Sequence, residues 1–408
     1  MNAHPDSRDH LASAPALTSA VRAGVRRISL SAFRSYDTLK LEVGDGPVVL
    51  AGANGSGKTN LLEAISFLAP GRGLRGARLT GVTHALPTGL PGVKPWAVAA
   101  EVYTPEGDVR MGTGLAPEGG EKRVVHVDGA AVRGQAVLAR HFGLVWLTPA
   151  MDRLFLEAPA ARRKFLDRLI IAFDPDHAGR TAAFDRAYRQ RARLFRDAVK
   201  DGVWYASLED TMARYGVAIA AARRDMINRL NAALVDARGP FPGARLELQG
   251  AVDDWLVQMP AVDVEEKLRG ALAQSRAARM AEDGASEPGP HRSDLVAVFA
   301  MPGHDSHGQA AEQCSTGEQK ALLIAILLAQ ARLQKIQRGF APVLLLDEIA
   351  AHLDRQRRQA LFSEILALGA QAWMTGTDEG VFADLGPSAQ VFAIRRNSLV
   401  PSPRNPPP

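Results

Sequence analysis

One eight-residue segment constrains the fold of this chain more than any other feature. Residues 52–59 read Gly-Ala-Asn-Gly-Ser-Gly-Lys-Thr and match the phosphate-loop pattern G-x-x-x-x-G-K-[ST] at every fixed position. An apolar run at 47–51 precedes the loop and predicts a buried strand. A helix is expected to begin near Gly57, because apolar residues follow at helical spacing: Leu61, Leu62, Ile65 and Leu68. This order places the N–H groups of a helix start where phosphates bind, so the sequence predicts a nucleotide-binding α/β domain.

The residues of the loop have separate expected roles. Its backbone N–H groups are expected to surround the phosphates, and Lys58 to place a cation on the β- and γ-phosphates. The hydroxyl of Thr59 is expected to bind Mg²⁺, which prefers oxygen ligands. ATP and Mg²⁺ are therefore the expected ligands. The expected contacts within the loop are Gly52, Ala53, Asn54, Gly55, Ser56, Gly57, Lys58 and Thr59.

Two acidic residues are expected to complete the site from about 290 residues further along the chain. Four consecutive apolar residues at 343–346 lead directly into Asp347 and Glu348. Such a run is typical of a strand buried on both faces of a parallel sheet, and ligands bind at the carboxyl ends of such strands. We expect Asp347 to hold Mg²⁺ through water and Glu348 to orient and deprotonate the attacking water.

A short polar motif lies about thirty residues before Asp347. It reads Ser315-Thr-Gly-Glu-Gln-Lys and precedes a strongly apolar helical segment. The motif resembles the signature of ABC-type ATPases, with Ser315, Gly317 and Gln319 at the characteristic positions. The resemblance implies that these residues complete the ATP site of a second subunit, because the motif cannot reach the ATP of its own subunit. Taken alone, Ser315 is as well explained as a helix N-cap that forms a capping box with Glu318.

The apolar patterns divide the chain into an α/β part and a helical part. Short alternating segments predict strands at 27–31, 39–43, 47–51 and between 96 and 127, with a hairpin turn at 128–129. Helical periodicity covers 153–173, 182–199, 208–238 and 262–281, a linker with Gly and Pro follows at 282–290, and strands return at 295–299 and 343–346. We expect a disordered leader at 1–22, an α/β lobe formed by 23–150 and 286–400, an inserted helical lobe at 151–285 and a disordered tail at 401–408.

The charge balance permits a polyanionic partner without requiring one. The 408 residues include 49 Lys and Arg against 44 Asp and Glu, a formal net charge of +5. Arginine, whose planar fork suits phosphate, forms two clusters. These are Arg162, Arg163 and Arg168, and then Arg189, Arg191, Arg193 and Arg196. They are expected as DNA-phosphate contacts, although a coding bias toward arginine or a solvated helix face explains each of them equally well.

Cysteine content and hydropathy indicate the compartment. The single cysteine, Cys314, excludes an intrachain disulfide and a cysteine-built metal site, and it fits a reducing environment. Residues 1–20 contain no apolar run long enough for a signal peptide. The most apolar segment, at 321–329, is far shorter than the roughly 20 residues that span a membrane. We expect a soluble, cytoplasmic protein without membrane contact.

Further segments resemble the RecF family, bacterial recombination-repair ATPases related to the heads of SMC proteins. The matching segments are Phe33-Arg34-Ser-Tyr36, the phosphate loop with its trailing Asn60, Leu147-Thr-Pro149, Arg162-Arg163-Lys-Phe165-Leu-Asp167, Gly289-Pro-His-Arg-Ser-Asp294-Leu and Thr375-Gly-Thr-Asp378. They span residues from about 25 to 380, nearly the whole chain. The resemblance adds Arg34 and Asn60 to the expected nucleotide contacts.

The resemblance also implies a fold and a function. The expected fold is α/β, an ABC-ATPase-like (SMC head-like) phosphate-loop domain with an inserted helical lobe. The expected activity is slow, DNA-stimulated ATP hydrolysis that controls an ATP-dependent homodimer on gapped or junction DNA. The expected partners are RecR and RecO, and the expected result is loading of RecA during DNA repair, replication restart and the SOS response to DNA damage.

Two features depart from the related ATPases or stay unassigned. ABC transporters have a His after the strand beyond the catalytic Glu, whereas this segment offers Thr375 or Thr377 as the γ-phosphate sensor. The usual Gln between the lobes is not assigned, because Gln135 is only a weak candidate and the expected place is at 145–146. The segment at 351–354 resembles the loop that crosses the dimer interface through Asp354, with His352 beside it as a packing or capping residue.

Three other classes share this ATPase core and differ in what surrounds it. The ATPase subunit of a membrane transporter has only a small helical subdomain and no arginine-rich insertion. An SMC-type chromosome-holding protein needs hundreds of coiled-coil residues. An overcoming-lysogenization-type nuclease needs an acidic nuclease domain after residue 380, where the sequence offers only a short tail.

Overall fold

The computed structural model describes residues 22–84, 94–118, 120–235, 240–280, 287–300, 308–350, 353–395 and 398–401. Residues 1–21 of the expected leader and 402–408 of the expected tail lie outside this part, and so does His352. Within it, no helix is both long enough and apolar enough to cross a membrane.

A mainly parallel sheet forms the centre of the α/β lobe. Its strand order is β15-β14-β3-β13-β12-β8. All neighbours pair in parallel except β14 and β15. The strands are β3 (Val48–Ala51), β8 (Leu144–Leu147), β12 (Val343–Leu346), β13 (Ala372–Gly376), β14 (Gln390–Arg395) and β15 (Ser398–Pro401). The phosphate loop follows β3 and the acidic pair follows β12, so both motifs emerge at the carboxyl edge of this sheet.

A second, antiparallel sheet covers the N-terminal side of the lobe. Its order is β2-β1-β4-β5-β6-β7. The strands are β1 (Gly24–Phe33), β2 (Tyr36–Glu42), β4 (Ala97–Thr104), β5 (Gly107–Leu115), β6 (Arg123–Val127) and β7 (Ala130–Ala131). The hairpin predicted at 128–129 is confirmed, because Asp128 and Gly129 join β6 to β7 with φ of 49° and 83°. Helix α1 (Lys58–Ser66) contributes Leu61, Leu62 and Ile65 to one core with both sheets.

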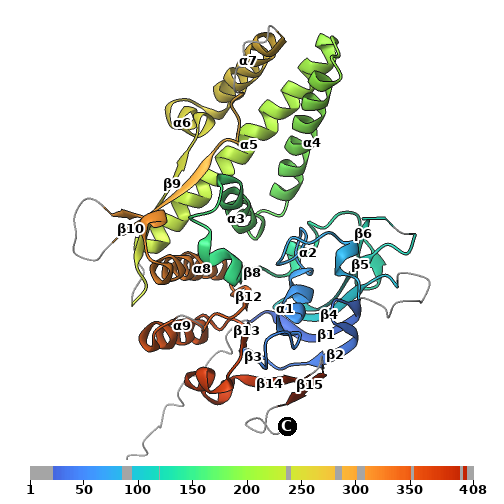
Figure 1. Cartoon of the computed structure of the whole chain (residues 1–408), viewed down its shortest axis with the longest axis vertical. Helices are drawn as coiled ribbons and strands as arrows, with labels where there is room; N and C mark the ends of the chain where they lie inside the picture. The colour runs from blue at the N-terminus through green and yellow to red at the C-terminus, as the bar shows by residue number, and fades with distance from the viewer. Residues whose placement is uncertain are drawn as a thin grey trace, which may run out of the picture.

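A helical lobe projects from the α/β lobe (Figure 1). Its helices are α3 (Pro159–Ile171), α4 (His177–Arg196), α5 (Gly202–Val235), α6 (Ala251–Gln258) and α7 (Ala261–Met280). The 34-residue α5 packs against both α4 and α7, and the core between them includes Phe184, Tyr205, Met212 and Leu268. The short α2 (Leu138–His141) lies outside this lobe, beside β5 and β6 in Figure 1, and its Leu138 is part of the core shared by the two sheets.

Three expectations about this lobe need correction. The helix expected from residue 153 begins at Pro159, which occupies the first helical turn, where its missing N–H costs nothing. The inserted lobe at 151–285, for which only helices were expected, also contains β9 (Gly243–Gln249). This strand pairs with β10 (Asp294–Ala300), and β10 pairs with β11 (Gln309–Ala310). The described end of the expected linker is packed, because Glu287 is buried and the carbonyl of Pro290 accepts a hydrogen bond from Arg223.

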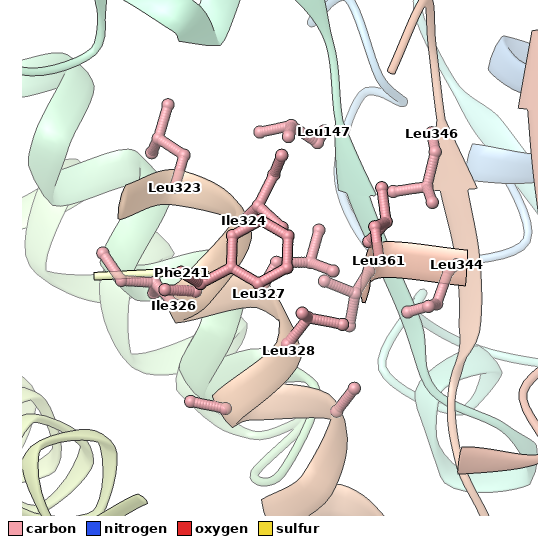
Figure 2. Close-up of a cluster of buried hydrophobic side chains, with 14 of the residues drawn as sticks. Leu147, Phe241, Leu323, Ile324, Ile326, Leu327, Leu328, Leu344, Leu346 and Leu361 are labelled. Atoms are coloured by element: carbon pink, nitrogen blue, oxygen red, sulfur yellow. The ribbon is translucent and has the colours of Figure 1, made fainter. Parts of the chain in front are cut away.

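The helix that follows the signature motif is central to the largest hydrophobic core. Helix α8 (Thr316–Arg338) is buried on all sides from Gln319 to Ala331. Figure 2 shows its side chains Ile324, Leu327 and Leu328 on the side of α8 that faces Leu344 of β12 and Leu361 of α9 (Arg355–Leu368). Replacing such a core leucine with alanine costs about 2–5 kcal/mol. The position of the signature motif is therefore fixed to the strand that carries the acidic pair.

Candidate nucleotide and DNA-binding sites

The phosphate loop has the backbone that its glycines predict. Gly55 and Gly57 have φ of 78° and 108°, in the left-handed region that favours glycine. A Cβ at Gly52 would lie 2.6 Å from the carbonyl oxygen of Ile394, so a side chain does not fit there. Helix α1 begins at Lys58 without a side-chain cap, and the buried hydroxyl of Ser56 has no partner. These groups form a cradle of unsatisfied donors that fits phosphate.

Lys58 lies inside the loop. Its ammonium donates hydrogen bonds to the carbonyls of Gly52 at 2.6 Å and Ala53 at 2.9 Å. Burial lowers the pKa of Lys58, and the charges of Glu348 and Asp347 oppose that shift. The structure thus brings the lysine of the loop and the acidic pair into one electrostatic environment, as the two motifs predict.

Asp347 is the centre of a hydroxyl network. Its Oδ1 accepts hydrogen bonds from the hydroxyl of Thr59 at 2.9 Å and from that of Thr375 at 2.8 Å. The neighbouring Glu348 donates its backbone N–H to the same Thr375 hydroxyl at 2.7 Å. A hydroxyl and a carboxylate are oxygen donors of the kind Mg²⁺ takes, so the expected pair Thr59 and Asp347 fits that ion.

The catalytic candidate Glu348 stands in an unusual backbone conformation. Its φ is 48°, which is costly for a residue with a side chain and is held here by the bond to Thr375. Glu348 lines a small cavity together with Asn54 and Thr377. Thr375 is fully buried behind the acidic pair, whereas Thr377 is exposed. Thr375 therefore positions the acidic pair, and assignment of the γ-phosphate sensor stays a prediction.

Arg34 and Asn60 support the loop from its outer side. Arg34 donates two hydrogen bonds, at 2.9 and 2.8 Å, to the buried carboxylate of Glu63 on α1. Arg75 binds the same carboxylate at 2.9 Å and also the side-chain carbonyl of Asn60 at 2.9 Å. Of the two arginines, Arg75 lines the cavity at the loop, together with Thr59. Whether Arg34 reaches the nucleotide stays a prediction.

Sequence reasoning missed Arg75. Its only signal is its place in the Gly- and Arg-rich segment at 71–78, directly after α1, which gives no spacing to a known motif. In the structure, Arg75 also lines a cleft of about 530 Å³ beside Asp347 and Glu348. Among the described residues, Arg75 is therefore the one cation that lines both this cleft and the cavity at the loop.

The same cleft lies at the junction between the α/β lobe and the helical lobe. Its far wall comes from Thr148 and Pro149 after β8 and from Lys164 and Arg168 of α3. The weak candidate Gln135 instead accepts hydrogen bonds from the N–H of Gly71 and from Arg123, and it is absent from the lining of this cleft. The buried Thr148 follows Leu147, whose carbonyl binds the N–H of Asp347, so a threonine occupies the place next to the acidic pair.

The signature motif forms the start of α8. The Ser315 hydroxyl accepts from the N–H of Glu318 at 3.3 Å and the Glu318 carboxylate accepts from the N–H of Ser315 at 2.8 Å, which together form the capping box considered above. The same carboxylate also accepts from the Ser315 hydroxyl at 2.7 Å. Gln319 is buried and donates to the carbonyl of Cys314, whereas Ser315 stays exposed. A Cβ added at Gly317 would meet no atom within 4 Å, so this helix start presents an open surface. The role of Ser315 at a second subunit's ATP stays a prediction.

The segment that resembles a dimer-interface loop ends at the N-cap of α9. Asp354 is exposed, and its carboxylate accepts from the N–H of Arg357 at 2.7 Å as the N-cap of α9. This cap fixes the end of the segment that follows the acidic pair. The contact of Asp354 with a second subunit stays a prediction.

Several arginines expected to contact DNA instead serve the protein itself, so the expectation is wrong for them. Arg162 binds both carboxylate oxygens of Asp294 at 2.7 Å, and Arg163 donates to the carbonyl of Ser293. Arg168 lies over the ring of Trp146 at 4.4 Å, and burial lowers its pKa to about 9. Arg191 is buried between the carboxylates of Glu209 and Glu287. A helical pattern cannot reveal these partners, because most of them are far away in the sequence.

The remaining arginines form a basic stripe on one exposed face of α4. The stripe consists of Arg186, Arg189, Arg193 and Arg196, all exposed and spaced by three or four residues. Within the described part of the chain, the first three form no ion pair, and Arg196 meets Asp197 at 3.6 Å. The buried residues Phe184, Ala187 and Leu194 lie on the opposite face, against α5. Long unpaired cations along one side of a projecting helix suit a line of phosphates.

Comparisons with known proteins agree with this geometry. The family model described as the RecF/RecN/SMC N terminal domain matches residues 24–398. A DNA replication and repair protein RecF from Rhizobium meliloti (strain 1021) is 46% identical over 371 residues, which cover 90% of this chain and 96% of that protein. The protein of the same name from Caulobacter sp. (strain K31) is 46% identical over 396 residues, with coverage of 93% and 97%.

Solved structures share the fold at lower identity. The recombination mediator protein RecF with ATP, of the RecFOR pathway, superposes with a TM-score of 0.78 at 21% identity, covering 95% of this chain and 100% of that one. An Smc head domain from Pyrococcus furiosus, bound to the C-terminal domain of ScpA, gives a TM-score of 0.51 at 18% identity, with coverage of 92% and 95%. The expected SMC head-like ATPase fold is confirmed.

Proposed function

This chain belongs to the RecF family of DNA replication and repair proteins, and we propose that it works as an ATP-gated clamp on gapped or junction DNA. Two copies would enclose two ATP molecules, each bound by the phosphate loop of one copy and by the helix start at Ser315 and Gly317 of the other. The expected contact from Gln319 is not part of this proposal, because its side chain is buried and donates to the carbonyl of Cys314. Closure would bring the two helical lobes onto DNA, and hydrolysis would release it. The family model and the fold already identify a domain of the RecF and SMC type, the type that binds ATP.

The observation that carries the proposal is the network around Asp347. Thr59 and Thr375 both donate to its Oδ1, so the loop that holds phosphate and the strand that carries the acids are joined at one oxygen. When bound there, Mg²⁺ would neutralise charge on the β- and γ-phosphates. Lys58 would bind the same phosphates, and Glu348 would orient the attacking water and accept its proton.

The open helix start at Ser315 supports a composite site. Its hydroxyl and the first N–H groups of α8 are exposed and can face the γ-phosphate of another copy. Because α8 is packed against β12, closure of the dimer would be transmitted to the acidic pair of the same subunit. Such a site hydrolyses ATP only when two copies meet, so turnover should be slow and should respond to DNA that favours closure.

The basic stripe on α4 supports the choice of DNA as partner. Phosphate contacts from Arg186, Arg189, Arg193 and Arg196 would make the affinity fall steeply with salt and carry no base sequence information. Recognition should therefore depend on the shape of the DNA. The RecFOR pathway named for a structural relative suggests RecR and RecO as partners, with RecA loading as the outcome.

Sedimentation of the Glu348→Gln variant tests the clamp. With saturating ATP and Mg²⁺, this variant should bind ATP without hydrolysing it and accumulate as a dimer, and gapped DNA should sediment with that dimer. The Lys58→Ala variant should stay monomeric, because it loses the cation on the β- and γ-phosphates. A Glu348→Gln protein that binds ATP and remains monomeric, with and without gapped DNA, would count against the clamp.

A further inference from the structure

Large apolar side chains are exposed at the outer end of the helical lobe. Val203 and Trp204, in the first turn of α5, are 81% and 51% exposed, and Met280, the last residue of α7, is 51% exposed. The guanidinium of Arg276 on α7 donates to the carbonyl of Gly202, so the two helix ends adjoin. Figure 1 shows that this end of the helical lobe, where α4 leads into α5, is the end farther from the α/β lobe. We call this surface, formed by residues 196–204 and the end of α7, the lobe tip.

The indole at the lobe tip is held on a rigid base. The carboxylate of Asp201 accepts from the N–H groups of Val203 and Trp204 at 2.9 and 3.0 Å and so caps the first turn of α5. The next residue, Tyr205, is fully buried, with its ring 4.9 Å from that of Phe195 on α4. An aromatic ring presented on a fixed backbone loses little entropy when a partner covers it.

The charge around the indole favours a polyanion over another protein of the same charge. Arg196 and Lys200 are exposed within the tip, and the guanidinium carbon of the exposed Arg279 lies 4.8 Å from the ring centroid of Phe195. Against these three exposed cations, the described part of the tip has two exposed carboxylates: Asp197, which lies 3.6 Å from Arg196, and Asp201, which caps α5. Like charge opposes the meeting of two such tips, whereas it attracts nucleic acid.

We propose that the lobe tip is a binding site for single-stranded DNA, in which an unpaired base stacks on Trp204 while Arg196 and Lys200 contact the adjoining phosphates. Bases within a duplex are already stacked on each other, so an exposed indole selects unpaired ones. The inference rests on the proposed function and deepens it. The basic stripe runs over ten residues of α4, about 15 Å, and ends at the tip. A duplex lying on the stripe would therefore deliver its single-stranded extension to Trp204.

Tryptophan fluorescence and DNA affinity test the proposal in the full chain. Trp96, Trp146 and Trp373 are buried, so a Trp255→Phe background leaves Trp204 as the one exposed indole among the described residues. Oligo(dT) should quench that fluorescence. In anisotropy titrations, Trp204→Ala should weaken binding to a duplex with a single-stranded overhang about tenfold, since one base stack is worth about 1–3 kcal/mol. Binding to a blunt duplex of equal length should not change.

The controls separate a lost stack from a damaged lobe. Trp204→Phe keeps a ring and should retain most of the overhang preference, and Val262→Ala, which removes an exposed apolar side chain from the other end of α7, should leave both affinities unchanged. Equal overhang binding by Trp204→Ala and the parent, or no quenching by oligo(dT), would overturn the proposal. Loss of ATP-dependent dimerisation by Trp204→Ala without DNA would also overturn it and assign the tip to a protein contact.

A separate variant tests the underlying function. The triple change Arg186→Ala, Arg189→Ala and Arg193→Ala removes unpaired stripe cations and leaves the tip intact. Blunt-duplex binding by this variant that equals the parent's would contradict the proposed path of DNA along α4. The response of Trp204 to oligo(dT) does not depend on that outcome, so the two failures are distinguishable.

Discussion

At the scale of single residues, the hydroxyl of Thr375 decides how the acidic pair is presented. It donates to Asp347 and accepts from the backbone of Glu348, which has a positive φ. The sequence left Thr375 and Thr377 as equal candidates, because residues two apart share one face of a strand. Strand β13 ends at Gly376, however, so Thr377 leaves that register and becomes exposed. The end of a strand is the feature that local pattern locates least well.

Replacing Thr375 with valine should therefore impair hydrolysis more than ATP binding. The change preserves shape and removes the hydrogen bonds that hold both acidic residues, so we expect about a 100-fold lower turnover, as misplacement of catalytic groups by about 1 Å produces. A loss of about 1–3 kcal/mol in the free energy of unfolding should accompany it, from unsatisfied buried groups. Single-turnover hydrolysis, ATP titration and denaturant unfolding measure the three effects. Thr375→Ser should be near normal, and equal turnover of Thr375→Val and the parent would exclude this positioning role.

Residues whose partners are remote in sequence were the ones that sequence reasoning misjudged. Arg191 was grouped with its exposed neighbours on α4, but its carboxylate partners Glu209 and Glu287 lie 18 and 96 positions away. By contrast, the phosphate loop and the acidic pair were predictable, because their chemistry requires fixed residue types next to each other. Pairing across the fold has no such local requirement.

At the scale of elements, the same limit explains why β9 was missed while α5 and α8 were expected. The strand alternates buried Ala244 and Leu246 with exposed Arg245, but seven residues of alternation inside a long helical region give a weak signal. Helix α5, with 34 residues, repeats its apolar spacing many times. Helix α8 carries both a capping motif and a long apolar run, so its start and its burial were each predictable.

The start of α8 has two proposed uses, and substitutions at Ser315 separate them. Asparagine and aspartate are both good N-caps, so Ser315→Asn and Ser315→Asp should keep the free energy of unfolding within about 1 kcal/mol of the parent. Aspartate also places a negative charge where the partner's γ-phosphate would lie. We expect ATP-dependent dimerisation to be lost in Ser315→Asp and largely kept in Ser315→Asn, with ATP binding to the monomer unchanged in both. Sedimentation and thermal unfolding give the two readouts, and dimerisation of Ser315→Asp at the parent's ATP concentration would leave Ser315 as a cap alone.

At the scale of the whole molecule, the phosphate loop and the helix start that is proposed to complete a partner's ATP site lie on different elements. The phosphate loop follows β3 in the α/β lobe, whereas Ser315 is the N-cap of α8, which packs against β12 and β8. The basic stripe and the lobe tip are on helices that project from this body (Figure 1). The proposed symmetric dimer would contain two composite sites, each with one half from either copy. Damage to the two halves should therefore be separable between subunits.

Mixing two inactive variants should restore one of the two sites. In a dimer of Lys58→Ala with Ser315→Asp, one site has both defects, and the other combines an intact phosphate loop with an intact Ser315. Each variant alone should stay monomeric, so the dimers that form in an equal mixture should combine the two variants, and each should retain ATP at one of its two sites. The measurement is ATP retained by dimers that carry both of two different affinity tags. A single chain with both changes, mixed with the parent chain, is the matched control and should retain none in its mixed dimers, because each of their sites has one damaged half. ATP retained by the control's mixed dimers and not by dimers of the two variants would mean that each subunit completes its own site, and it would contradict the exchange of Ser315 between copies.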